Sequence, residues 1–152
     1  MAYHYQESGL DNVYIENGYT IHKTPYGEGV SIQDTPGLHK AIGRWIVAEP
    51  NGITGAELRF LRLEMELAQR TLAGILGSKE QNVRNWERAR TKAIPGSADR
   101  LLRAIYMQYV DGQSDVRRMV DRLAELDCVA EAKVCFRETN RGWLPAEAAH
   151  AA

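Results

Sequence analysis

Amide, carboxylate and basic side chains crowd one short stretch of the chain. Between residues 79 and 92 lie Lys79, Glu80, Gln81, Asn82, Arg84, Asn85, Arg88, Arg90 and Lys92. In a DNA major groove, Gln and Asn pair with adenine, Arg pairs with guanine, and Glu accepts from cytosine. The chemistry open to this stretch is therefore the recognition of base edges and the binding of phosphate.

Signatures of catalysis are absent from the sequence. It contains no Walker loop, nucleophile elbow, HExxH pair or dinucleotide fingerprint, and carboxylates such as Asp11 and Glu49 have no evident partner. The four histidines are scattered, without Cys, Asp or Glu at a recognised ligand spacing. We therefore expect no enzyme activity, no metal site and no cofactor.

The spacing of apolar residues orients this polar stretch. Val83 and Trp86 form the inward pair of a helix that begins near Lys79. The outward face then consists of Glu80, Gln81, Asn82, Arg84, Asn85 and Arg88. Gln81 and Asn85, one turn apart, are the strongest candidates for base recognition. Gln69 is the first residue of the preceding helix, and we expect its side chain to bind a DNA phosphate, together with the backbone amides at that helix N-terminus.

The basic residues at and after the end of this helix are predicted to bind phosphate. We expect Arg88, Arg90 and Lys92 to meet the flanking DNA backbone.

Capping signals predict the helices that must hold these residues. Thr54 and Glu57 form a capping box that starts a helix over about 54–66, and Gly77 ends a second helix over 69–76. The third helix carries the polar stretch, and a fourth covers about 97–109. Two helices joined by a tight turn are the minimum geometry for entering a major groove.

Residues 67–90, LAQRTLAGILGSKEQNVRNWERAR, closely resemble the Cro/C1-type (XRE) helix-turn-helix family. Gln69 stands where that family usually has Gln, followed by Leu72-Ala73, Leu76-Gly77 and the Trp86-Glu87 pair. The chain departs at Ser78 and Lys79, where a hydrophobic residue and then Ser or Thr are usual. The resemblance covers residues 54 to about 109 and implies a helix-turn-helix DNA-binding transcriptional regulator.

The charge distribution agrees with this interpretation. Residues 54–109 carry ten basic against six acidic side chains, whereas the segments before and after them carry net charges of −3 and −2. A basic middle between acidic ends is expected if only the middle meets phosphate.

The flanking segments predict a small lobe and a C-terminal extension. Asn17-Gly18, between alternating apolar residues, predicts a type I′ hairpin, with a third strand at 29–33 and a helix over 37–48. The best linker is 49–52. Beyond residue 110, a helix over 114–127 and a strand or hairpin over 133–144 are expected.

We therefore predict an α+β, mainly α fold. It divides into a strand-rich lobe with a helix (1–50), a five-helix-type helix-turn-helix DNA-binding domain (53–110), a C-terminal helix and strand (113–145) and a disordered tail (146–152).

The N-terminal layout, with GLDNVYIENGY and then YGEGVSIQDTPGLHKAIGRWI, resembles MqsA-type antitoxins. The zinc-binding cysteines of those proteins are missing, since Ser8 stands where one is expected. Two functions remain open: a repressor that binds double-stranded DNA as a homodimer, and an antitoxin whose acidic lobe binds a partner toxin while the helix-turn-helix autoregulates its operon.

Localisation follows from composition. No apolar run is long enough to span a bilayer, and the N-terminus lacks the features of a signal peptide. We expect a cytoplasmic protein without a membrane partner, in which Cys128 and Cys135 remain thiols.

Overall fold

Local capping interactions set the boundaries of the helices in the computed structural model, which describes residues 2–111 and 135–146. Thr54 caps α2 (Gly55–Glu64) in the predicted capping box: its hydroxyl accepts from the Glu57 amide at 3.3 Å, and the Glu57 carboxylate accepts from the Thr54 amide at 3.0 Å. This exchange satisfies two donors that a helix start otherwise leaves unpaired.

Gly77 ends α3 (Gln69–Ile75), as the sequence predicts. It has a φ of +66°, and the Ser78 amide donates to the Ala73 carbonyl at 2.8 Å, which is the Schellman arrangement of a helix C-terminus. Residues 76–79 then lead into α4 (Glu80–Arg88), and the chain continues to α5 (Gly96–Val110). The helix ends that the sequence predicts lie within two residues of the observed ends.

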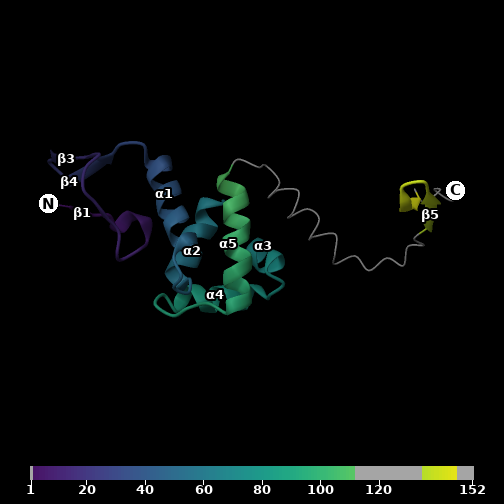
Figure 1. Ribbon diagram of the computed structural model, residues 1–152. Coiled ribbons are helices and arrows are strands. Elements are labelled where there is room, and N and C mark those ends of the chain that lie inside the picture. The colour runs from purple at the N-terminus through teal and green to yellow at the C-terminus, as the bar shows by residue number, and fades with distance from the viewer. Residues whose placement is uncertain (1, 112–134, 147–152) are drawn as a thin grey trace.

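α1 (Thr35–Ala48) belongs to the same helical body. It contacts α2 and α5, and its Ile42 and Ile46 share one hydrophobic core with Leu58, Leu102 and other buried residues of 53–110. Figure 1 shows α1, α2 and α5 side by side, with α4 crossing at their foot. Five helices are thus described, of which four lie within 53–110 and the fifth packs on them from the N-terminal lobe.

The predicted hairpin at Asn17-Gly18 is wrong. β2 (Tyr14–Ile15) pairs with β1 (Tyr3–His4), whereas β3 (Tyr19–Thr24) pairs with β4 (Gly27–Ile32) around a turn at residues 25 and 26. Thr24 closes that turn through its hydroxyl, which accepts from the Tyr26 amide and donates to the Gly27 carbonyl. A short helical turn, η1 (Gln6–Ser8), follows β1.

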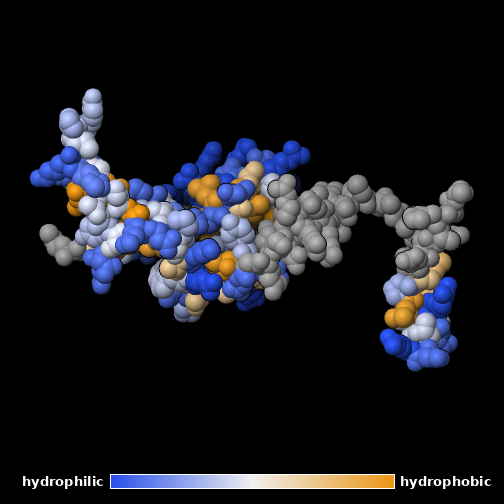
Figure 2. All heavy atoms as spheres, turned by 90° about the horizontal axis from the view of Figure 1, so that it is seen from above, coloured by the Kyte–Doolittle hydropathy of each residue, from blue (hydrophilic) through white to orange (hydrophobic). Residues whose placement is uncertain are grey.

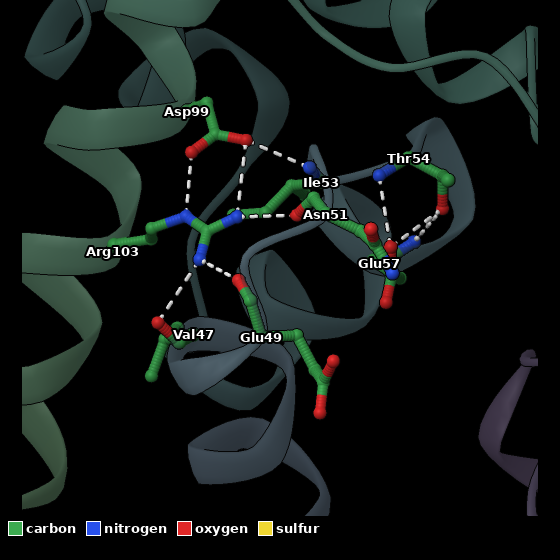
Figure 3. A network of polar contacts seen from close by, with 8 residues as sticks. All are labelled: Val47, Glu49, Asn51, Ile53, Thr54, Glu57, Asp99 and Arg103. Atoms are coloured by element: carbon green, nitrogen blue, oxygen red, sulfur yellow. Dashed lines mark hydrogen bonds and ion pairs between the residues drawn. The ribbon is translucent and has the colours of Figure 1, made fainter.

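The predicted linker at 49–52 is held in place by one arginine. The Arg103 guanidinium, on α5, donates to the carbonyl oxygens of Val47 (3.1 Å), Glu49 (2.5 Å) and Asn51 (2.6 Å), while Asp99 accepts from its Nε at 2.5 Å (Figure 3). The other Asp99 oxygen accepts from the Ile53 amide at 2.7 Å. This Arg103 clip fixes the path between α1 and α2.

A hairpin of β5 (Cys135–Thr139) and β6 (Gly142–Ala146) turns at residues 140 and 141, as predicted. Its Phe136 and Leu144 side chains are exposed, and Figure 2 shows hydrophobic atoms among hydrophilic ones on it. The expected helix at 114–127, Cys128 and the tail from 147 onward lie outside the described residues. None of the helices in the described ranges is both long and apolar enough to cross a membrane.

Candidate nucleic-acid interface

The inner face of α4 is fixed to α2 and α3. Val83 is fully buried, Trp86 is partly buried against the core, and Glu87, one turn after Val83, is only 8% exposed. The sequence correctly placed Val83 and Trp86 on this face. It gave Glu87 no role.

Glu87 forms a buried ion pair with Arg62 of α2. The Arg62 Nε donates to Glu87 Oε2 at 2.8 Å and its Nη2 donates to Oε1 at 2.9 Å, while Nη1 donates to the Leu67 carbonyl at 2.9 Å. All three contacts use the planar fork of the guanidinium. Arg62 therefore fixes both α4 and the turn that leads into α3.

Gln69, the predicted phosphate ligand, reaches the same carboxylate. Its Nε2 donates to Glu87 Oε1 at 3.3 Å. The side chain at the start of α3 is thereby placed beside α4. Arg59, whose Nε lies 3.9 Å from Glu87 Oε1, stands next to it with its side chain 51% exposed.

A glycine allows α2 and α4 to meet closely. A Cβ atom added to Gly55 would lie 1.9 Å from the Trp86 carbonyl oxygen and 2.7 Å from that of Ala89. The start of α2 therefore packs directly on the backbone at the end of α4. Any side chain at position 55 would push the two helices apart.

The outer face of α4 is polar and open to solvent. Gln81, Asn82, Arg84, Asn85 and Arg88 are exposed, and Glu80 is half-buried. The Gln81 amide donates to Asn85 Oδ1 at 3.0 Å, and Arg84 pairs with Glu80 at 2.7 Å across one helical turn. These two contacts orient the four side chains along the axis of α4.

A basic groove runs along the edge of this face. Its lining residues come from α2, α3, α4 and the segment after α4, and they are Arg59, Gln69, Arg84, Glu87, Arg88 and Arg90. Four are arginines, and the only carboxylate is already paired with Arg62. Arg59 was missed by the sequence prediction, because a single Arg on a helix gives no signal until its neighbours in space are known.

The remaining predicted site residues lie at the ends of the polar face. Lys79 is the exposed N-cap residue of α4 and makes no side-chain capping bond. Lys92 is exposed too, and its carbonyl accepts from the Gly55 amide at 3.1 Å. Arg90 is different, since its guanidinium already contacts the N-terminal lobe. In the part of the chain that the structure describes, no cluster of His, Cys, Asp and Glu is arranged to hold a metal ion.

Comparison of the chain with models of known protein families, with curated protein sequences and with solved structures found no match.

Proposed function

We propose that the protein is a sequence-specific DNA-binding regulator, a repressor that reads the major groove with α4 as a homodimer. The observation that supports this most is the division of α4 into two faces. Its inner face is held by the buried Arg62–Glu87 pair, and its outer face exposes amide and guanidinium groups one turn apart. A rigidly mounted helix with such a face matches what major-groove recognition requires.

The basic groove beside α4 supplies the second half of the proposal. Base recognition needs phosphate contacts that fix the register of the protein on the duplex. Gln69 at the start of α3 and Arg59 on α2 lie beside α4, and both are accessible from the groove. We assign phosphate binding to these two residues and to Arg88, and base recognition to Gln81 and Asn85.

The decisive experiment selects bound duplexes from a random library with the purified full chain, and then measures the affinity of variants for the selected duplex and for random DNA. Gln81→Ala and Asn85→Ala should each weaken binding to the selected duplex by about tenfold to a hundredfold, because a bidentate base contact is worth about 1–3 kcal/mol. Binding to random DNA should fall by less than about twofold. A selected site with two symmetric half-sites about one helical turn apart would support the homodimer.

Gln108→Ala is the matched control, since Gln108 is an exposed glutamine on another helix, α5. It should leave both affinities unchanged. The proposal is wrong if no duplex is enriched. If the two substitutions lower the affinity for selected and for random DNA equally, Gln81 and Asn85 bind phosphate and not bases.

A further inference from the structure

The loop of residues 9–12 brings the N-terminal lobe to the edge of the basic groove. Arg90 Nη2 donates to the Gly9 carbonyl at 2.7 Å, and the same nitrogen lies 3.5 Å from Asp11 Oδ2. Arg90 lies 81 positions after Gly9 in the sequence. Arg90 lines the groove as well, so one side chain belongs to both surfaces.

This loop is firmly anchored. Leu10 is 3% exposed and sits in the common hydrophobic core, while Ser8 Oγ accepts from the Leu10 amide at 3.1 Å. The His4 ring nitrogen Nε2 lies 2.7 Å from the Asp11 carbonyl, to which it must donate. These contacts fix the backbone of residues 10 and 11, and the Asp11 carboxylate lies beside Arg90 although its side chain is 78% exposed.

We propose that residues 9–12 are a built-in restraint on DNA binding, in which the Gly9 carbonyl occupies an Arg90 N–H and the Asp11 carboxylate offsets the Arg90 charge where the DNA backbone would approach. This inference rests on the proposed function. The Nη2 N–H that donates to Gly9 is not free for phosphate, although the other guanidinium N–H groups are, and the exposed Asp11 carboxylate adds repulsion where phosphate would approach. A cationic partner that pairs with the exposed Asp11 carboxylate would leave the Arg90 charge available to DNA.

Asp11→Asn tests the restraint, because it removes the charge and preserves the size of the side chain. We expect this variant to bind random duplex about twofold to fivefold more tightly than the wild type at low salt. The effect is small because an exposed ion pair contributes little free energy. The slope of log affinity against log salt should steepen by about one unit when Arg90 gains a phosphate contact. Adding Arg90→Gln to Asp11→Asn should abolish both gains.

Glu28→Gln is the matched control, since it removes the same charge from an exposed position on β4. If its affinity rises as much as that of Asp11→Asn, the effect is one of net charge and the restraint is overturned. Unchanged binding by Asp11→Asn overturns the restraint and leaves the proposed function standing. Failure of the wild type and of every variant to bind any duplex overturns both.

Discussion

At the scale of single residues, Glu87 holds the candidate interface together. Its carboxylate accepts from Arg62 twice and from Gln69 once, so a charged side chain joins three helices from a buried position. The sequence contains a signal for this that is easy to miss: Glu87 follows Val83 by one helical turn and therefore shares its inner face. A charged residue on a polar helix is usually solvated, which is why its burial was not predicted.

Glu87→Gln should destabilise the protein by about 3–5 kcal/mol, because it leaves the buried Arg62 charge without its counterion. Urea unfolding measures the change. The double variant Arg62→Met with Glu87→Leu is the control, since replacing both charges with apolar groups should recover most of the lost stability. A single variant that unfolds at the wild-type urea concentration would show that the pair is not buried in solution.

At the scale of elements, the helices and the C-terminal hairpin were predictable, whereas the pairing of the N-terminal strands was not. The capping box at Thr54 and the glycine at 77 act within a few residues, so the sequence carries their full signal. Strand pairing depends on residues that are distant along the chain. Asn17-Gly18 is a strong local turn signal, yet β2 pairs with β1 and β3 pairs with β4, so the turn joins strands of different sheets.

The contact between α2 and α4 also belongs to this scale, and Gly55→Ala tests it. The added methyl would collide with the Trp86 carbonyl. We expect a loss of about 1–3 kcal/mol in the free energy of unfolding, as for other overpacked sites, and weaker duplex binding as α4 shifts.

Gly74→Ala provides the control for that substitution. Its Cβ would meet nothing within 4 Å, and Gly74 lies inside α3. Alanine there should raise the thermal midpoint, because it favours helix more than glycine does. Equal effects of the two substitutions would contradict close packing at Gly55.

At the scale of the whole molecule, the Arg103 clip joins α5 to the connection between α1 and α2, and it contains a titratable group, Asp99. Burial by itself raises the pKa of Asp99, but the hydrogen bonds from Arg103 and from the Ile53 amide outweigh it and lower the pKa below its ordinary value. A carboxylate whose pKa is lowered by folding stabilises the protein above its unfolded pKa. That stabilisation is lost as the pH falls through the lower, folded pKa.

We therefore expect the free energy of unfolding to decline as the pH falls below about 4, and Asp99→Asn to flatten this decline while lowering stability at neutral pH. Denaturant titrations between pH 7 and pH 2 measure both. Glu28→Gln, which alters an exposed carboxylate, should keep the wild-type profile. Parallel profiles for the wild type and Asp99→Asn would show that Asp99 does not contribute to the acid response.

The Arg103 clip also limits how the chain could be recombined. By composition, residues 49–52 resemble a linker at which one lobe could be exchanged for another. Because Arg103 binds three carbonyls around that linker, its geometry is specified by a side chain that lies about fifty residues downstream. A graft of the N-terminal lobe onto a foreign helical domain would succeed only if the recipient supplied an arginine at the matching turn of its last helix.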